Sequence, residues 1–353
     1  MDPFSSKKWV RFHLTNTKGY VFEYFIREIL KGCGFEKVNI DNEILYESTS
    51  GIMIHGLGQS HNADVLVEPL MQVPFFYPSR MLVECKCYTN KLGIEFVRNV
   101  LGLRTDINNF DIVTPEILEN RRNYRRNNNR VYNYTRYFYQ VVLASISDFT
   151  IPAQEFAVIH KIPIISFDKI SLFEPIKAFI LRSDDYYDRL SEDKKKKFLE
   201  IIRGKRDFTG NQSFGEEIDL FFISVQERVN NMQIGILEDG TTLFLFKEEI
   251  PTKLRRNILN DTFELFWANN MRSWRIETSE YNYYFELPGL VMKRWLDQEI
   301  ENQQKEALRI KDTYFSKITV YGRNNDYQSI KTLKISREFM QRAARELANN
   351  LLE

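Results

Sequence analysis

Three charged side chains lie in segments that the sequence otherwise predicts to be buried strands. Glu84 and Lys86 belong to the apolar run 81–88, and Asp64 opens the apolar run 64–67. Side chains alternate along a strand, so Glu84 and Lys86 point to the same face. Burying such charges is unfavourable unless each has a partner or binds a metal ion. The group therefore predicts either a structural ion pair or a site that carries out chemistry.

These residue types favour hydrolysis of a phosphodiester with the help of a divalent cation. If the two strands pair, Asp64 lies beside Glu84. Both carboxylates and the carbonyl oxygen of Cys85 then form a ligand set that suits Mg²⁺, with Mn²⁺ as an expected substitute. Such an ion neutralises phosphate charge, lowers the pKa of its bound water and stabilises the leaving oxygen. Lys86 adds a positive charge for the attacking water or the phosphorus centre.

The position of this acid-x-Lys triplet in an apolar run distinguishes it from the other such triplets in the chain. Those triplets overlap at 192–195 in a polar run that continues to Lys197, and a solvated helix face explains them, with nucleic-acid contact as the alternative. Cys85 and Cys87 alternate with Glu84 along the strand, so their thiols are expected to pack in the core rather than to bind metal.

Helices and strands alternate among the elements expected to position these residues. Apolar residues at helical spacing from Val21 to Leu30, preceded by residues 17–19, predict the first helix, which glycines at 32 and 34 end. The other elements expected in the first half are strands over 35–40, 64–67, 81–88, 139–146 and 162–167, and helices over 92–107 and 150–160. Residues 47–62 and 69–80 are expected to be loops, the first with room for a short strand. Strands separated by helices predict an α/β domain with a mixed sheet.

The second half of the chain is expected to be a smaller α+β domain over 214–353. It follows a charge-rich stretch, 181–213, which is interpreted as a linker that includes a helix near 192–203. Asp239-Gly240 between two apolar runs is a strong hairpin signal. The expected elements are strands over 232–237, 242–246, 263–267, 273–277 and 281–287, a charged helix over 292–312 and an amphipathic helix from 336 onwards. Recognition of DNA and regulation are both open as roles, because no motif decides between them.

Composition limits the classes of protein to which the chain can belong. Its 353 residues suggest about two domains, and 43% hydrophobic with 27% charged residues is ordinary for a globular protein. No apolar stretch approaches the ~18 residues of a membrane-spanning helix, and the N-terminus has no secretory signal. Three cysteines are too few for a disulfide framework or a four-cysteine zinc site. A cytoplasmic protein with no membrane partner is therefore expected.

One segment has the composition of a nucleic-acid contact. The net charge of the chain is only +1, so any nucleic acid must be bound by a local patch. The segment 121–136 holds six arginines, three tyrosines and no acidic residue. Arginine suits bidentate phosphate contacts, and tyrosine can stack on bases. The arginines expected to contact DNA are Arg121, Arg122, Arg125, Arg126, Arg130 and Arg136. The alternatives are a solvated insertion and a surface that binds an acidic partner.

The order of the elements and four short motifs resemble the PD-(D/E)xK nuclease superfamily, and its Mrr-like restriction endonuclease branch in particular. The motifs are Gly19-Tyr20-Val21-Phe22-Glu23, Glu84-Cys85-Lys86, Ala153-Gln154-Glu155-Phe156-Ala157 and Ile162-Pro163-Ile164-Ile165, within residues 17–170. The resemblance implies an α/β fold with a restriction-endonuclease-like mixed β-sheet flanked by helices. It also implies that Asp64 and Glu84 hold the metal ion, that Lys86 is the catalytic lysine and that Glu23 is an accessory carboxylate. Ala63 stands before Asp64 where the family motif has a proline.

Two polar residues are further candidates for the same site. His61, three residues before Asp64, is a candidate to contact substrate phosphate or to serve as a base. The alternative for His61 is a loop histidine that hydrogen-bonds to the backbone. Gln154 stands where Mrr-like proteins place a polar residue that faces the site, and the alternative is an ordinary exposed glutamine on a helix.

Together these observations predict a Mg²⁺-dependent endodeoxyribonuclease of restriction or antiviral defence type, with its nuclease domain over 1–180. Cutting both strands of a duplex needs two active sites, so a homodimer is expected. One alternative is an effector nuclease that a ligand or protein partner activates through the C-terminal domain. Another alternative is a protein that binds nucleic acid without cleaving it.

Overall fold

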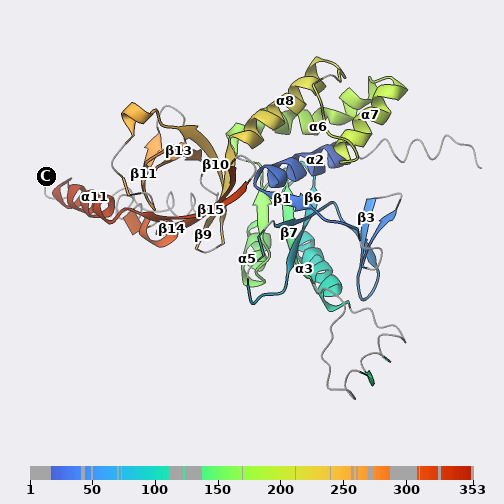
Figure 1. Cartoon of the computed structure of the whole chain (residues 1–353), viewed down its shortest axis with the longest axis horizontal. Coiled ribbons are helices and arrows are strands. Elements are labelled where there is room, and N and C mark those ends of the chain that lie inside the picture. Colours follow the sequence, from blue (N-terminus) through green and yellow to red (C-terminus); the bar gives the residue numbers. More distant parts are fainter. Residues whose placement is uncertain are drawn as a thin grey trace, which may run out of the picture. The chain divides into compact units, whose positions relative to one another are not determined.

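The computed structural model of the chain separates into two units (Figure 1). The sheet unit comprises residues 1–26 and 35–168, and the barrel unit comprises 27–34 and 169–353. The residues that the structure describes are 17–40, 44–48, 51–69, 71–72, 74–110, 119, 122–123, 137–168, 170–210, 212–238, 240–255, 258–259, 261–268, 273–286, 308–309, 311–324 and 327–350.

Helix α2 (Thr17–Gly32) forms where the sequence predicts it, because its apolar residues recur at helical spacing. Phe22 and Phe25 are almost fully buried, and both rings meet the ring of Phe167 edge-on at centroid distances of 5.8 and 5.4 Å. After the helix, Gly34 adopts a φ of 89°, a conformation that a side chain would strain. The helix begins in the sheet unit and ends in the barrel unit.

The sheet unit contains a five-stranded sheet with the strand order β1-β5-β6-β7-β8. Its strands are β1 (Phe35–Lys37), β5 (Val65–Pro69), β6 (Ser79–Lys86), β7 (Phe138–Ser145) and β8 (Ile164–Ser166). Strand β5 runs antiparallel to β1 and to β6, whereas β6, β7 and β8 run parallel to one another. The sheet is therefore mixed, and its buried parallel strands are the continuous apolar runs of the sequence.

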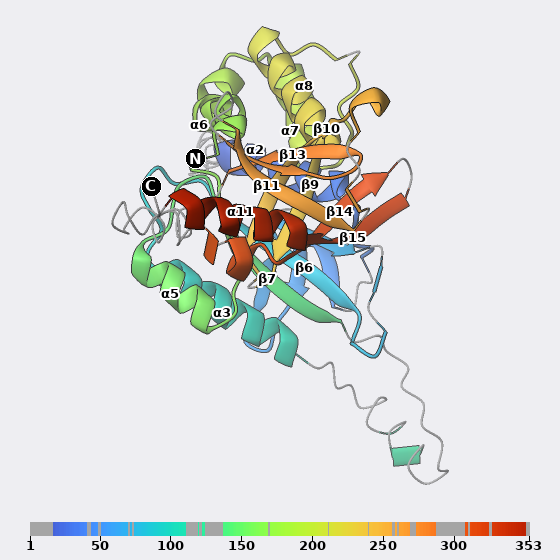
Figure 2. The same cartoon turned by 90° about the vertical axis from the view of Figure 1, so that its left-hand side faces the viewer.

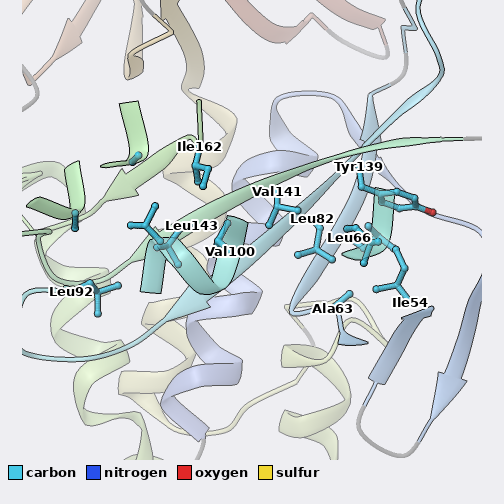
Figure 3. Close-up of a cluster of buried hydrophobic side chains, with 14 of the residues drawn as sticks. Ile54, Ala63, Leu66, Leu82, Leu92, Val100, Tyr139, Val141, Leu143 and Ile162 are labelled. Atoms are coloured by element: carbon cyan, nitrogen blue, oxygen red, sulfur yellow. The ribbon is translucent and has the colours of Figure 1, made fainter. Parts of the chain in front are cut away.

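A separate three-stranded sheet and two helices complete the sheet unit. These elements are β2 (Leu45–Ser48), β3 (Gly51–His55), β4 (Ser60–Asn62), α3 (Ile94–Asn109) and α5 (Ile151–Ile159). Their apolar side chains form one buried cluster with one face of the large sheet (Figure 3). Members of this cluster are Leu45, Ile54, Leu66, Leu82, Val97, Val100, Val141, Leu143, Ala153 and Ala157.

Seven strands of the barrel unit close into a barrel with the order β10-β13-β12-β11-β15-β14-β9. They are β9 (Met232–Leu237), β10 (Thr242–Glu249), β11 (Thr262–Ala268), β12 (Ser273–Glu277), β13 (Tyr281–Phe285), β14 (Lys317–Asn324) and β15 (Tyr327–Ile335). Strands β11 and β15 are parallel, and the other neighbouring pairs are antiparallel. Fully buried Leu245, Leu265 and Ile276 belong to the barrel's core.

Helices of the barrel unit pack through aromatic side chains. They are α6 (Glu174–Asp188), α7 (Glu192–Ile202), α8 (Glu216–Asn230) and α11 (Arg337–Asn350), with the short 3-10 helices η1 (Ser171–Phe173) and η2 (Thr252–Leu254). Phe179 of α6 stacks on Phe221 of α8 at a centroid distance of 4.2 Å. Helix α11 lies against the barrel (Figure 2), where Phe339 meets Phe266 edge-on. In the described part of the chain, every helix is too short or too polar to traverse a lipid bilayer.

The predicted fold class, a restriction-endonuclease-like mixed sheet flanked by helices and followed by a smaller α+β domain, is wrong. The chain combines a closed seven-stranded barrel with separate five-stranded and three-stranded sheets and with helices, and only the general mixture of α and β holds. Local patterns predict single strands and hairpins. Closure depends on pairs between distant strands, such as β9 with β14, which no local pattern encodes.

The helix predicted near 192–203, within the segment interpreted as a linker, is present as α7, and its buried side includes Phe198 and Ile201. The segment 181–213 also contains the end of α6. One further difference from the sequence analysis has a local cause. The loop expected over 47–62 contains most of the three-stranded sheet, because glycines and polar residues mask its short strands. The helix expected over 292–312 lies largely outside the described residues.

Candidate functional site

Asp64 and Glu84 come together where β5 and β6 pair. The antiparallel register places Val65 opposite Val83, and the same register brings Asp64, one residue before β5, opposite Glu84. Residues opposite one another on antiparallel strands point to the same face of a sheet. The backbone N–H of Cys85 donates a hydrogen bond of 2.9 Å to Asp64 Oδ2. This bond holds the Asp64 carboxylate against β6.

Lys86 completes the group through an ion pair along its own strand. Its Nζ donates a hydrogen bond of 3.0 Å to Glu84 Oε2. The Lys86 side chain is 29% exposed and that of Glu84 is 15% exposed, so the pair is largely enclosed but open to solvent. Burial lowers the pKa of Lys86, but the negative charges of Glu84 and Asp64 outweigh it and the pKa is raised overall. Lys86 is therefore a positive charge at neutral pH.

Asp64 carries the clearest electrostatic signature of the group. Its pKa is raised to about 6, first by burial and next by the charge of Glu84, against the opposing effects of the Cys85 N–H and of Lys86. Such a shift is expected where neighbouring carboxylates repel each other in a partly desolvated place. Two carboxylates share one ammonium, and a cation placed between them would relieve their repulsion.

A third carboxylate, Glu23 on α2, lies close enough for its charge to act on the same strand. Burial raises the pKa of the Cys85 thiol, and the charges of Asp64, Glu23 and Glu84 raise it further. The three acids that the sequence predicted therefore act on one residue of β6. The Cys85 thiol stays protonated at neutral pH, so it does not supply a thiolate ligand.

The donor set fits a Mg²⁺ ion held by two carboxylates, and it does not form a complete cage. Within the ranges that the structure describes, no three His, Cys, Asp or Glu side chains converge in a way that could hold a metal ion. Mg²⁺ is commonly bound through one or two carboxylates and completes its shell with water and substrate phosphate. Asp64 and Glu84 are the residues that would hold the ion. The carbonyl oxygen of Cys85 stays a predicted third ligand.

Strand β7 places a polar residue beside Lys86 that the sequence analysis did not single out. In the parallel pairing of β6 with β7, Leu143 lies next to Glu84 and Ser145 lies next to Lys86. Ser145 is fully buried, and its Oγ lies 3.1 Å from Ser147 Oγ. In the sequence, Ser145 could have been noticed as a serine near the end of an apolar run that pairs with the strand carrying Glu84 and Lys86.

His61 is held by a partner outside this group. Its Nε2 lies 2.7 Å from Oδ2 of Asp106 on α3. That hydrogen bond lowers the pKa of Asp106, and the backbone N–H of Gly58 contributes to the same effect. The alternative for His61 is a hydrogen bond to the backbone. In the structure the partner of His61 is instead a carboxylate, 45 residues away along the chain.

Gln154 lies on α5, and its amide is partly satisfied. Its Nε2 donates a hydrogen bond of 3.0 Å to the carbonyl oxygen of Phe149. Its Oε1 is buried and has no hydrogen-bond partner among the described residues. A role for Gln154 in the site stays a prediction.

The arginine-rich segment lies almost entirely outside the described residues. Of its six arginines, Arg122 alone is described, and it is exposed. A different candidate for contact with bases is the β5–β6 loop, where Phe75, Phe76 and Tyr77 are exposed. This loop precedes β6, whereas Glu84 lies near the end of that strand, so roughly 20 Å of extended chain separates them.

Comparisons with known proteins leave the family of the chain open. Neither a protein-family model nor a curated protein matches it. Among solved structures, the chain is similar to the crystal structure of a protein of unknown function, AF1548, with 12% sequence identity and a TM-score of 0.27. That match covers 52% of this chain and 98% of the other. A TM-score this low does not establish a shared fold.

Proposed function

We propose that the chain is a Mg²⁺-dependent endonuclease that hydrolyses phosphodiester bonds of DNA. The observation that carries the proposal is geometric: Asp64 faces Glu84 across paired strands, and Lys86 contacts Glu84 at 3.0 Å. Burial and then the charge of Glu84 raise the pKa of Asp64 to about 6, which supports the proposal. A phosphodiester resists hydrolysis because its own negative charge repels nucleophiles. A site with two acids for a cation and one fixed ammonium addresses that difficulty.

The carboxylates would bind the ion, and the chain holds them ready to do so. The Cys85 N–H restrains Asp64, and the Lys86 ammonium restrains Glu84. With a pKa of about 6, Asp64 is mostly ionised at neutral pH and can serve as a ligand. When bound, Mg²⁺ supplies charge neutralisation, a water of lowered pKa and stabilisation of the leaving oxygen.

Lys86 would stabilise negative charge as it builds up on the phosphate. Its ammonium is partly enclosed and is oriented by Glu84, so it needs little rearrangement when the charge develops. Partial exclusion of water strengthens that interaction. Glu23 would act as an accessory carboxylate, either directly or through water.

The proposed substrate is duplex DNA, and the proposed role is restriction or antiviral defence. The resemblance to the PD-(D/E)xK nuclease superfamily supports this assignment through its site residues and not through its fold. Six arginines within residues 121–136 add a sequence-based reason to expect phosphate contacts. A homodimer would supply one site for each strand.

Plasmid cleavage in Mg²⁺ or Mn²⁺ tests the proposal. Asp64→Asn and Lys86→Met should each lower the rate by at least about 100-fold, the scale of losing one electrostatic group of an active site. Lys91→Met is a matched control, because Lys91 also pairs with a carboxylate, Asp148, at 2.9 Å but is mostly exposed. It should cleave at nearly the parental rate. Circular dichroism and thermal melting confirm that each variant is folded.

Each alternative predicts a different result in the same assay. Parental rates in both site variants would show that the assignment is wrong. Intact plasmid after prolonged incubation, together with a mobility shift, would favour a protein that binds nucleic acid without cleaving it. Cleavage that begins only after a small molecule is added would favour an effector nuclease. Single-stranded DNA and RNA, tested in parallel, establish which nucleic acid is cut.

A further inference from the structure

The loop between β5 and β6 presents three consecutive aromatic side chains to solvent. Phe75 is fully exposed, Phe76 is 74% exposed and Tyr77 is 71% exposed. Residues 70–79 carry no charged side chain, so the rings form an uncharged surface. A contiguous apolar patch of this kind on a globular protein usually marks a binding surface.

The backbone at Phe75 adopts a conformation that a phenylalanine disfavours. Its φ is 68°, in the left-handed region, and it follows Pro74 in a turn, where glycine is the usual residue. Lys161 also has a positive φ, but it directly follows the C-cap of α5, where such a conformation is common. The fully exposed ring of Phe75 contributes no burial, so folding gains nothing from a phenylalanine at this position.

Polar contacts fix the base of the loop. The Oε1 of Gln72 accepts a hydrogen bond of 2.8 Å from the backbone N–H of Ser79, and its Nε2 donates one of 3.1 Å to the Ser79 carbonyl oxygen. One residue further along β6, Arg80 contacts Glu68 of β5 at 3.3 Å. The rings are therefore presented by a preorganised turn, which loses little conformational freedom when it meets a partner.

Strand β7 begins beside this loop. The backbone N–H of Phe138 donates a hydrogen bond of 2.8 Å to the carbonyl oxygen of Pro78, and Cζ of Arg80 lies 3.5 Å from the centre of the Tyr137 ring. In the sequence, Tyr137 directly follows the stretch 121–136, with its six arginines and no acidic residue. The aromatic turn therefore adjoins the point where a strongly basic stretch of sequence enters β7.

We propose that Phe75, Phe76 and Tyr77 stack on unpaired bases of a nucleic-acid strand. Every base has an aromatic face, so stacking on exposed rings is favourable and tolerates any sequence. The basic sequence that enters β7 beside the loop has the charge that phosphates attract. A lipid surface and a second copy of this chain are the other partners that exposed rings could meet, but neither offers flat aromatic faces next to phosphates.

This stacking surface deepens the proposed nuclease function, and it rests on that function only for the choice of DNA as the strand. The loop precedes β6, and Glu84 lies near the end of the same strand, so roughly 20 Å of extended chain separates them. Successive nucleotides of a strand rise by about 3.4 Å. The rings would therefore contact bases roughly six nucleotides from a phosphate held at Glu84.

Binding of single strands to the full chain tests the proposal, with EDTA present so that no cleavage takes place. The probes are a fluorescein-labelled strand of thymidine nucleotides and an equally long, equally labelled strand of abasic nucleotides. Both carry the same phosphates, but only the first can stack. Fluorescence anisotropy at one ionic strength should show that the thymidine strand binds at least about tenfold more tightly, which is within the range for one or two stacked bases.

Variants separate a binding role of the rings from a structural one. Glycine suits the positive φ, so Phe75→Gly should not lower the midpoint of thermal unfolding, whereas it should weaken binding of the thymidine strand by about tenfold. Phe76→Leu keeps an apolar side chain without a ring and should weaken binding similarly. Val158→Ala is the control, because Val158 is 72% exposed on α5 of the same unit and should not affect binding.

Several results would overturn the proposal. Equal affinity for the two strands would show that phosphates alone are contacted, and undiminished binding in both variants or no binding of the thymidine strand would exclude the rings. Co-sedimentation with vesicles of phosphatidylcholine and phosphatidylserine, or self-association in sedimentation velocity, that Phe75→Gly abolishes in a chain that binds no strand would assign the rings to a membrane or to a second copy. None of these results bears on cleavage at Asp64, which the plasmid assay measures separately.

Discussion

Both units place two carboxylates opposite each other on paired antiparallel strands, but the two pairs differ in the cations that lie beside them. In the barrel, Glu264 faces Glu277, and each carboxylate contacts its own guanidinium, from Arg342 and Arg275. In the sheet unit, Asp64 faces Glu84, and Lys86 is the cation that the structure places beside both.

The difference lies in charge balance rather than in the local motif. Glu84-x-Lys86 and Arg275-x-Glu277 are both ion pairs between residues two apart on one strand. Where each acid has its own cation, an ion pair suffices as an explanation. Where two acids share one lysine, burial and then the charge of Glu84 raise the pKa of Asp64 to about 6, and a further cation would be bound favourably. An ion pair between residues two apart on a strand, with a second acid opposite, therefore indicates chemistry only when the second acid does not have a cation of its own.

The largest expected effect separates the two pairs by activity. Glu84→Gln should lower plasmid cleavage by about 100- to 1,000-fold, because it removes a metal ligand and the partner of Lys86. Glu277→Gln makes the same change in the barrel and should leave the rate per folded molecule within about threefold. Equal losses in the two variants would remove the distinction between them.

The next expected effect is on the free energy of unfolding and concerns the carboxylate pair of the barrel. Glu277 is 4% exposed, so Glu277→Gln leaves Arg275 without its charged partner and should lower the free energy of unfolding by roughly 3 kcal/mol. Urea unfolding monitored by tryptophan fluorescence measures the change. Glu264→Gln is the control, since the side chain of Arg342 is 57% exposed and that pair should be worth about 1 kcal/mol or less.

Asp64→Asn should stabilise the protein at high pH while lowering the cleavage rate by at least about 100-fold. The pKa of Asp64 in the folded state, about 6, lies above its ordinary value of 3.8. Between these two pH values the folded state therefore binds more protons than the unfolded state. Stability is therefore lost as pH rises from about 4 to 6, and asparagine avoids that loss. In EDTA at pH 8 we expect a gain of up to about 3 kcal/mol, shrinking toward pH 4. A constant difference across this range would contradict the assigned pKa.

The same titration should shape the pH dependence of cleavage. A protonated Asp64 cannot hold the cation, so at Mg²⁺ concentrations below saturation the rate should fall about tenfold per pH unit below pH 6. Raising the metal concentration should move the midpoint to lower pH, because metal and proton compete for one carboxylate. A rate that stays flat down to pH 5 would exclude Asp64 as a ligand.

The smallest expected effect concerns His61. Its imidazole is paired with Asp106 at 2.7 Å, so His61→Ala should lower the free energy of unfolding by about 1 kcal/mol. Its cleavage rate should stay within about twofold of the parent, which corresponds to a change of less than ~0.5 kcal/mol. A much larger loss of rate would show that His61 takes part in cleavage.

Much of the local structure could be predicted, because it depends on patterns within a few residues. Helical spacing predicts α2, continuous apolar runs predict β6 and β7, and Asp239-Gly240 predicts the hairpin of β9 and β10. Short strands with polar faces, such as β4, and strands without a turn signal, such as β14, give no comparable pattern. Barrel closure was missed for the same reason, since it rests on pairs between distant strands.

The sequence by itself determined the chemical types at the candidate site: an acid before one strand, an acid and a lysine two apart on the next, and a glutamate on the first helix. Tertiary structure alone decided that Asp64 faces Glu84 and that His61 turns to Asp106. It also placed the start of β7 beside the loop that carries Phe75. The physical reason is range. Residue type and spacing act over a few residues, whereas charge balance and burial depend on neighbours that only the folded chain brings close.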